Sequence, residues 1–233
     1  MPVYQLGPEI VFPPPQWSEP DGLLAVGGDL SVERLLTAYS MGIFPWYSEE
    51  SDILWWSPDP RMVLRPGRMH ISRTLAKVIR QQRFEIRTDT SFNKVIGHCA
   101  HNPRPGRQST WILDDMLQAY QRLHKAGFAH CLETWQEDRL VGGLYGVSLG
   151  GMFFGESMFS LVSDASKVAL AALSRGLAEW DFDLIDCQLP SAHLRRLGCR
   201  EMKRRRFLER LAQSLRKTTR KGSWSQDAFN LDI

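Results

Sequence analysis

The feature that most restricts the fold of this chain is a set of three alternating apolar segments near its middle. Apolar residues recur at every second position over residues 131–135, 139–148 and 152–159. Two short connections, residues 136–138 and 149–151, join these segments. Period-two segments separated by such short connections are typical of β-hairpins. The pattern therefore predicts a three-stranded antiparallel meander.

A helix and a further strand are predicted after this meander. Asp164 or Ser166 can cap a helix that turns residues 168–177 inward, and a strand follows over residues 184–189. A short helix is then expected over residues 191–197, because Gly198 can end it. Three antiparallel strands, a helix and another strand predict an α+β fold class.

The first sixty residues contain nine prolines, which exclude long regular elements from most of this segment. A helix capped by Ser31 and ended by Gly42 is the expected exception. Five aromatic residues follow within thirteen positions: Phe44, Trp46, Tyr47, Trp55 and Trp56. Such a group either packs against the rest of the fold or lines a pocket. We expect a small N-terminal lobe over residues 1–60 and a larger domain over residues 61–233 with a basic C-terminal tail.

Positive charge is concentrated in two segments of the chain. Residues 61–87 carry a net charge of +7 and residues 200–221 carry +8, which leaves −12 on the rest of a chain whose formal net charge is +3. This separation indicates a polyanionic partner, although ordinary solvated surface charge explains either segment equally well by itself.

A helix predicted over residues 72–82 places three of these basic side chains, Arg73, Lys77 and Arg80, on one face. This stripe suits contact with phosphates. Residues 203–206 are all Lys or Arg. They either extend such a surface or belong to a solvated, partly disordered end.

The sequence indicates neither a metal site nor a membrane span. The four cysteines, Cys99, Cys131, Cys187 and Cys199, form no C-x-x-C pair, which favours buried free thiols in a reducing compartment. The longest apolar run, residues 168–173, is far shorter than the ~20 residues of a membrane span. The first residues lack the pattern of a secretory signal. We therefore expect a cytoplasmic protein.

Three polar residues on the predicted strands are candidates for chemistry. Strict alternation places Glu156 among apolar neighbours on one strand face, where a carboxylate without a partner or ligand is costly. Alternation also places Leu184, Asp186 and Gln188 on one face, with about 7 Å between the acid and the amide along the strand. The acid and the amide can then address one bound group. Alternatively, they cap the following helix or bond to neighbouring backbone.

Seven segments, taken in order, resemble the leucyl/phenylalanyl-tRNA–protein transferase family: GLLAVGGDLS, GIFPWYS, LWWSPDPR, STWI, HCLETWQEDRLVGGLYGVSLGGMFFGESMFS, ASKVAL and LIDCQL. The resemblance extends over about residues 5–211 and fades in the basic tail. It implies a GNAT-type acyltransferase fold for the larger domain. It also implies transfer of Leu or Phe, less readily Met, from aminoacyl-tRNA to the α-amino group of proteins that begin with Arg or Lys, which marks them for N-end-rule degradation. Because an aminoacyl ester is already activated, no cofactor is expected.

The resemblance also implies roles for individual residues. Asp186 and Gln188 are implied to be catalytic. Because a carboxamide is too weak a base to keep a proton, we expect Gln188 to orient the attacking amine, and Asp186 either to fix Gln188 and stabilise positive charge or to act as the base. Glu156 is implied to lie in the active site, where a carboxylate suits an acceptor whose first side chain is cationic. Trp46 and Trp111 are implied to flank the aminoacyl-adenosine.

An apolar pocket and an RNA-binding surface complete the implied site. The pocket positions are Leu144, Met158, Leu170, Leu173 and Ile185. The stripe of Arg73, Lys77 and Arg80 is implied to contact tRNA.

Two other classes of protein stay open on the residues alone. An acyl-CoA-dependent N-acyltransferase would share the fold class, but residues 160–166 contain no glycine, and a CoA pyrophosphate is usually held by a glycine-rich turn at a helix N-terminus. A non-catalytic RNA-binding module would explain the basic segments but not the acids on apolar strand faces.

Overall fold

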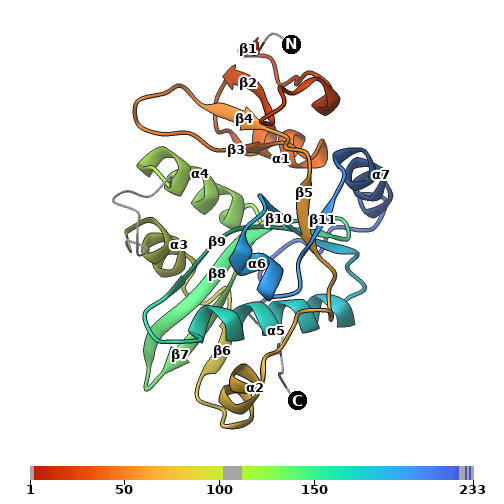
Figure 1. Cartoon of the computed structure of the whole chain (residues 1–233). Helices are drawn as coiled ribbons and strands as arrows, with labels where there is room; N and C mark the ends of the chain where they lie inside the picture. The colour runs from red at the N-terminus through yellow and green to blue at the C-terminus, as the bar shows by residue number, and fades with distance from the viewer. Residues whose placement is uncertain (1–2, 102–111, 226–228, 230, 232–233) are drawn as a thin grey trace.

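Two β-sheets organise the protein, and Figure 1 shows the smaller one above the larger. The computed structural model describes residues 3–101, 112–225, 229 and 231. Within these residues the smaller sheet has four strands in the order β1-β2-β4-β3. The larger sheet has seven strands in the order β11-β5-β10-β9-β8-β7-β6. The chain passes from one sheet to the other between β4 and β5.

The smaller sheet is built from short strands, as the density of prolines requires. Its strands are β1 (Tyr4–Leu6), β2 (Leu23–Gly27), β3 (Phe44–Pro45) and β4 (Leu54–Trp56), and the helices of this part are the 3-10 helix η1 (Pro15–Trp17) and α1 (Val32–Ser40). The predicted cap of α1 is confirmed, because Ser31 Oγ accepts a hydrogen bond from the backbone of Arg34 at 3.3 Å. Trp55 is fully buried, and its indole donates to the carbonyl of Gly27 at 2.9 Å.

The larger sheet contains the predicted meander. Its strands are β5 (Arg61–Leu64), β6 (Glu85–Thr88), β7 (Ala129–Gln136), β8 (Arg139–Leu149), β9 (Met152–Ser160), β10 (Leu184–Gln188) and β11 (Arg200–Met202). Strand β8 pairs antiparallel with both β7 and β9. Strands β9 and β10 run parallel, and helix α5 (Ala165–Glu179) forms the connection between them. The predicted α+β class is confirmed.

Helices cover both faces of the larger sheet. Besides α5 they are α2 (Arg73–Arg80), α3 (Phe92–His101), α4 (Asp114–Lys125), α6 (Ala192–Arg196) and α7 (Arg204–Ser214). A Cβ atom at Gly142 would lie 2.5 Å from Ala165 of α5, whereas one at Gly143 would lie 3.5 Å from Val95 of α3. Successive strand residues point to opposite faces, so α5 and α3 cover opposite faces of β8.

The start of α5 differs from the sequence prediction. Asp164 occupies the N-cap position with φ of 70° but makes no capping bond, because its carboxylate pairs with Lys167 at 2.7 Å. The first turn of the helix is held instead by Ser160, whose hydroxyl accepts from the backbone N–H of Ser166 at 2.9 Å.

Five elements in or around the larger sheet were not predicted: β5, β6, β11, α3 and α7. Helix α7 corrects the interpretation of the basic tail as a partly disordered end, because Phe207 and Leu211 are buried on its inner face. Arg204, one of the four consecutive basic residues, donates to Ser18 and to the carbonyl of Ser57 rather than pointing to solvent. The helix therefore joins the C-terminal segment to the segments around the smaller sheet.

A buried carboxylate holds the start of α3. Glu133 on β7 accepts hydrogen bonds from the backbone N–H groups of Thr90 and Ser91 at 2.8 and 2.7 Å. It also accepts from the indole of Trp135 at 2.8 Å, and its side chain is fully buried. The first N–H groups of a helix lack partners within the helix, so an acceptor supplied from the sheet anchors this end of α3.

Replacing Glu133 with Gln is expected to lower the free energy of unfolding by roughly 2–3 kcal/mol, because an amide NH₂ would then face donors that have no other acceptor. Urea unfolding followed by circular dichroism measures the difference. The control is Glu137→Gln, since Glu137 is exposed in the β7–β8 turn. Equal midpoints for the two variants would contradict this role of Glu133.

Candidate active site

A cavity of about 730 Å³ lies where β9, β10, α5 and α6 meet the end of the smaller sheet. Its volume is in the range of small-molecule sites. Its apolar lining includes five predicted pocket residues: Leu144, Met158, Leu170, Leu173 and Ile185. Glu156 and Gln188 reach the same cavity. A largely apolar space is thus combined with one carboxylate and one carboxamide from the described residues.

A β-bulge directs Glu156 into the cavity. In the β8–β9 ladder Tyr145 pairs with Ser157 and Gly146 pairs with Gly155, so Glu156 is the extra residue. A bulge reverses the side on which later side chains lie. The expectation of strict alternation through β9 is therefore wrong.

The neighbours of Glu156 show the effect of this bulge. Phe154 packs against Tyr39, with ring centroids 5.0 Å apart, in the core between the two sheets. Met158 instead packs with the apolar cluster that contains Leu144 and Leu170.

A second irregularity separates Asp186 from Gln188 on β10. The register against β5 shifts between these residues, and Gln188 has a left-handed backbone with φ of 62°. Gln188 consequently lines the cavity, whereas Asp186 does not. The prediction that Asp186 and Gln188 share one strand face is wrong, because an irregularity interrupts the alternation of side chains here as the bulge does in β9. The two residues stay linked, because the backbone N–H of Gln188 donates to Asp186 Oδ1 at 2.9 Å.

Glu156 is held by three donors from distant parts of the chain. Tyr39 on α1 donates to its Oε1 at 2.8 Å, and Tyr120 on α4 donates to its Oε2 at 3.1 Å. Gln188 Nε2 also donates to Oε1, at 2.8 Å. No hydrogen bond from a described residue reaches the amide oxygen of Gln188, so this atom is available to a ligand in the cavity.

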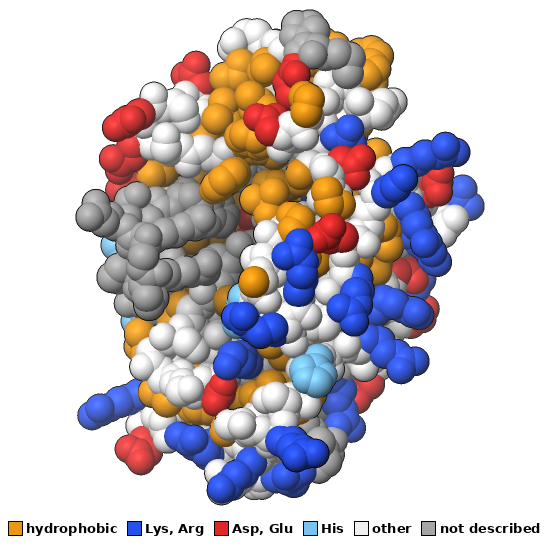
Figure 2. Space-filling model, viewed as in Figure 1, with side chains coloured by type: hydrophobic (Ala, Val, Ile, Leu, Met, Phe, Trp, Pro, Cys, Tyr) orange, Lys and Arg blue, Asp and Glu red, His pale blue; other side chains and the backbone are white. Residues whose placement is uncertain are grey.

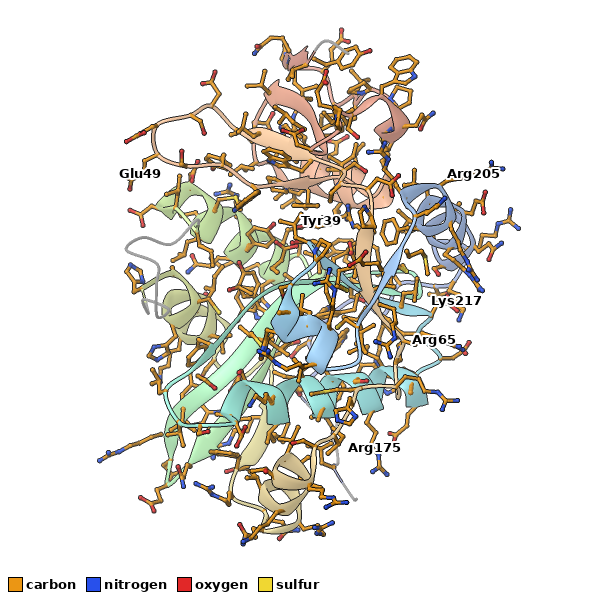
Figure 3. The ribbon with its side chains drawn as sticks, viewed as in Figure 1. Tyr39, Glu49, Arg65, Arg175, Arg205 and Lys217 are labelled. Atoms are coloured by element: carbon orange, nitrogen blue, oxygen red, sulfur yellow. The ribbon has the colours of Figure 1, made fainter. Side chains whose placement is uncertain are left out.

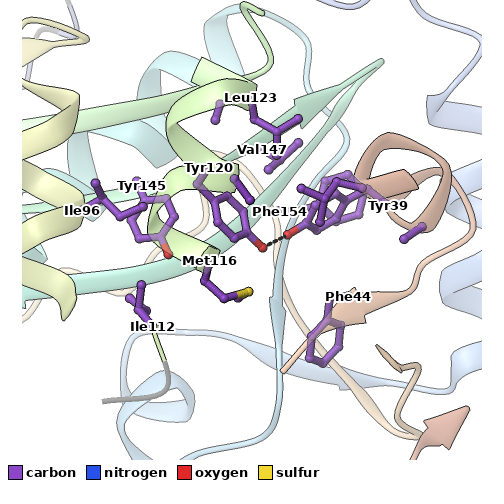
Figure 4. Packing of buried hydrophobic residues seen from close by; sticks show 14 of the residues in the cluster. Tyr39, Phe44, Ile96, Ile112, Met116, Tyr120, Leu123, Tyr145, Val147 and Phe154 are labelled. Atoms are coloured by element: carbon purple, nitrogen blue, oxygen red, sulfur yellow. Dashed lines mark hydrogen bonds between the residues drawn. The ribbon is translucent and has the colours of Figure 1, made fainter. Parts of the chain in front are cut away.

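The two tyrosine hydroxyls are also hydrogen-bonded to each other, as the dashed line in Figure 4 shows. There are thus three contacts among Tyr39, Tyr120 and the Glu156 carboxylate. Each hydrogen bond needs one proton, and when Glu156 is ionised the two hydroxyl groups supply protons for only two of the three. A proton on Glu156 would supply the third. All three contacts can therefore be hydrogen bonds only when Glu156 carries a proton.

Burial raises the pKa of Glu156 to about 7, and the negative charge of Asp186 adds to this rise. The hydrogen bonds from Tyr39, Tyr120 and Gln188 favour the anion and oppose the shift. A carboxyl group whose pKa lies close to neutral pH can both take up and release a proton during a reaction. Burial likewise raises the pKa of both tyrosines well above the usual value, so they act as hydroxyl donors.

Asp186 is neutralised by a fully buried arginine. Arg61 Nε lies 2.9 Å from Asp186 Oδ1, and its Nη2 lies 2.7 Å from Oδ2. The guanidinium is sandwiched between Phe44 and Phe207, at 4.8 and 4.6 Å from the ring centroids. Its Nη1 donates to the carbonyl of Gly42 at 3.0 Å.

Arg61 was counted with the basic segment expected to meet a polyanion. This assignment is wrong, because the side chains of Arg61 and its partner Asp186 both have zero exposure. The residue instead joins β5 and β10 to the loop after α1 and to α7. The sequence signal for this role is weak: an arginine between a proline and an apolar strand, far from its partner in the chain. Tyr39 and Tyr120 were missed likewise, because they occupy ordinary core positions of amphipathic helices.

The remaining predicted site residues are dispersed. Trp46 lines the cavity and packs against Trp56, with ring centroids 5.6 Å apart. Trp111 lies outside the described residues. Arg73, Lys77 and Arg80 are exposed on α2, as predicted, and do not line the cavity.

The cysteines are free thiols. Cys99, Cys131 and Cys199 are buried, and Cys187 is partly buried with its sulfur 3.8 Å from that of Cys199. In the part of the chain that the structure describes, no group of three or more His, Cys, Asp or Glu side chains could hold a metal ion. No helix of this part is long and apolar enough to cross a membrane.

The chain is similar to known proteins over nearly all of its length. A family model described as leucyl/phenylalanyl-tRNA protein transferase matches residues 63–212, and the model of the N-terminal domain of the same family matches residues 28–59.

Curated relatives named leucyl/phenylalanyl-tRNA–protein transferase come from several bacteria. The relative from Anaeromyxobacter sp. (strain Fw109-5) is 56% identical over 228 residues, 98% of this chain and 97% of the relative. The relative from Myxococcus xanthus (strain DK1622) is 52% identical over 230 residues, 98% of each chain.

Two solved structures show a distant similarity. L-PGS from Bacillus licheniformis has 9% identity and a TM-score of 0.39, covering 72% of this chain and 53% of that one. A GCN5-related N-acetyltransferase from Kribbella flavida has 10% identity and a TM-score of 0.34, covering 71% of this chain and 58% of that one. Values this low carry no argument about activity.

Proposed function

This chain belongs to the leucyl/phenylalanyl-tRNA–protein transferase family and is an aminoacyltransferase, and from this premise we propose its reaction in detail. It transfers Leu or Phe, less readily Met, from aminoacyl-tRNA to the α-amino group of proteins that begin with Arg or Lys. The product is marked for N-end-rule degradation. The reaction takes place in the cytoplasm, where aminoacyl-tRNA is made.

The observation that carries this proposal is the junction of the apolar cavity with the Glu156–Gln188 pair. Leu144, Leu170, Leu173 and Ile185 are each at most 5% exposed and can enclose the side chain of the transferred amino acid. An aliphatic or aromatic side chain gains from leaving water in such a space, whereas a charged one does not. The aminoacyl carbonyl would then lie near the polar pair.

The acceptor amine is proposed to meet Gln188 and Glu156 at this point. A free α-amine has a pKa of about 7.7–8.0, so a neutral fraction exists near neutral pH. The amide oxygen of Gln188 accepts a hydrogen bond from this amine and directs its lone pair towards the ester carbonyl. Glu156 is the one carboxylate among the described lining residues, so its negative charge also favours an acceptor with a cationic first side chain.

The bonds and protons of the proposed step balance within the site. The amine nitrogen forms a bond to the aminoacyl carbonyl carbon and becomes positively charged. Its proton passes to the Glu156 carboxylate. The ester C–O bond then breaks, and the ribose oxygen leaves with a proton returned by Glu156. Asp186 is a positioning residue, because it fixes the backbone of Gln188 from outside the cavity.

The α2 stripe, defined as Arg73, Lys77 and Arg80, is proposed to contact the tRNA backbone. Its three side chains are exposed, while Leu75, Val78 and Ile79 anchor the helix on its other face. Contacts to phosphates position an RNA without reading its bases. Such contacts suit an enzyme that accepts more than one tRNA.

The direct test is transfer of labelled Leu from Leu-tRNA to a peptide that begins with Arg, compared with the same peptide carrying a blocked α-amine. We expect label only in the free peptide. Gln188→Ala is expected to lower the single-turnover rate by roughly 100-fold, because the amine loses its orienting partner. Absence of transfer by the wild-type protein, or transfer from acetyl-CoA to this peptide, would refute the proposed reaction.

A further inference from the structure

A second group of exposed arginines lies beside the cavity and is distinct from the α2 stripe. We call it the α6 patch and define it as Arg65, Arg68, Arg196 and Arg200, all exposed. In Figure 2, Lys and Arg side chains gather over α6 and β11, between the basic groups on α7 and on α2. Arg65, labelled in Figure 3, lies on the β11 side of α6.

The patch is assembled from two segments far apart in the sequence. Strand β11 pairs with β5 so that Arg200 is opposite Val63, two residues before Arg65. The backbone N–H of His70 donates to the carbonyl of Leu197 at 2.9 Å. A Cβ atom at Gly198 would lie 3.1 Å from the carbonyl oxygen of Arg68. The loop after α6 and the segment that leads into α2 are therefore packed together.

This packing places the patch between the cavity and the α2 stripe. Three residues of the α6 region, Ser191, His193 and Leu194, line the cavity. Arg196 follows in the same helix. In the other direction, the segment containing Arg68 continues into Ser72, which caps α2 by accepting from the backbone of Leu75 at 3.2 Å.

Within the described part of the chain, no acidic side chain pairs with the charges of the patch. Arg195 is excluded from the patch because it pairs with Glu201. None of the four patch arginines forms an ion pair with another described residue. Like charges held together cost stability and give a surface strong attraction for a polyanion.

We propose that the α6 patch binds the phosphate backbone of the 3′ acceptor arm of aminoacyl-tRNA. This inference rests on the proposed function, since an aminoacyl ester seated in the cavity carries the 3′ end of an RNA with it. The nucleotides next to that end leave through the cavity mouth, and residues of the α6 region form part of the lining there. The patch then guides the RNA backbone from the mouth of the cavity towards the α2 stripe.

The test compares a patch variant with a matched control. The double variant Arg196→Gln/Arg200→Gln removes two patch charges. The control is Lys125→Gln/Arg139→Gln, which removes two exposed charges elsewhere. Arg139 begins β8, which is separated from β5 by β9 and β10 in the sheet. Binding of tRNA is measured at several salt concentrations, and transfer to an Arg-initiated peptide is measured from Leu-tRNA and from leucyl-adenosine, which has no phosphates.

The patch variant is expected to bind tRNA about 10-fold more weakly and to lower the slope of log affinity against log salt by about 2. Its transfer rate from leucyl-adenosine should equal that of the wild type, and the control should match the wild type throughout. An unchanged salt slope would overturn the proposal, as would an equal loss with leucyl-adenosine. A raised KM for the peptide with unchanged tRNA binding would instead assign the patch to the acceptor protein.

Failure of the proposed function gives a different result from failure of the proposal about the α6 patch. In that case the wild type would transfer from neither Leu-tRNA nor leucyl-adenosine. The tRNA-binding measurements would still support or overturn the role of the patch.

Discussion

Replacing Glu156 with Gln is expected to lower the single-turnover rate of aminoacyl transfer by about 100-fold or more at pH 8. The amide has the same size and can still accept from Tyr39 and donate to Tyr120. It cannot take the proton that the attacking amine loses. The loss should therefore appear in the rate of the chemical step rather than in the affinity for Leu-tRNA, which serves as the internal control.

The pH dependence provides a sharper test of the same role. In the wild type both the amine and Glu156, whose pKa is about 7, must be unprotonated before the amine attacks. Below pH 7 the logarithm of the rate should rise with pH with a slope of roughly 2, whereas Glu156→Gln should give roughly 1 because only the amine titrates. If the variant keeps the wild-type slope and rate, another group receives the proton.

The raised pKa of Glu156 should also make the free energy of unfolding depend on pH, in a direction that can be predicted. The pKa of Glu156 is raised from 4.5 to about 7 on folding, so between these values the native state binds more protons than the unfolded state. The contribution of Glu156 to stability is therefore greatest below pH 4.5 and is lost as pH rises through 7, by about 3 kcal/mol at most. In urea unfolding, Glu156→Gln should become more stable relative to the wild type as pH rises across this window.

The sequence predicted the elements whose periodicity is local. The meander, α5 and the strand that carries Asp186 all have regular apolar patterns over five or more residues, and their bounds differ from the structure by only one or two residues in most cases. Strands β5 and β6 have four residues each, which is too short to give a periodic signal. Helix α7 is so rich in arginine that its two buried apolar residues do not dominate the pattern.

The candidate site was predicted as a set of residues but not as an arrangement. Alternation assumes an unbroken ladder, and both Glu156 and Gln188 lie at bulges that depend on how the neighbouring strand is paired. The tyrosines that hold Glu156 come from helices 117 and 36 residues away along the chain. Contacts of this kind follow from packing between elements, which no local pattern in a single sequence specifies.

Replacing Arg61 with Met is expected to lower the free energy of unfolding by about 3–5 kcal/mol, because Asp186 would remain buried without its counter-charge. Methionine fills much of the space between Phe44 and Phe207, so the loss of charge is the main change. The transfer rate should fall by roughly 100-fold, since Gln188 keeps its left-handed backbone partly through its bond to Asp186. Urea unfolding and single-turnover transfer measure the two effects.

The double variant Arg61→Met/Asp186→Asn separates positioning from chemistry. It removes both buried charges but keeps an oxygen that can accept from the backbone N–H of Gln188. Because a neutral, well-packed pair avoids the desolvation of two ions, stability should return to within about 1 kcal/mol of the wild type. If Asp186 only positions Gln188, the transfer rate should recover with stability. A variant that is stable but stays about 100-fold slow would show that the charge of Asp186 acts on the reacting amine, as expected of a direct base.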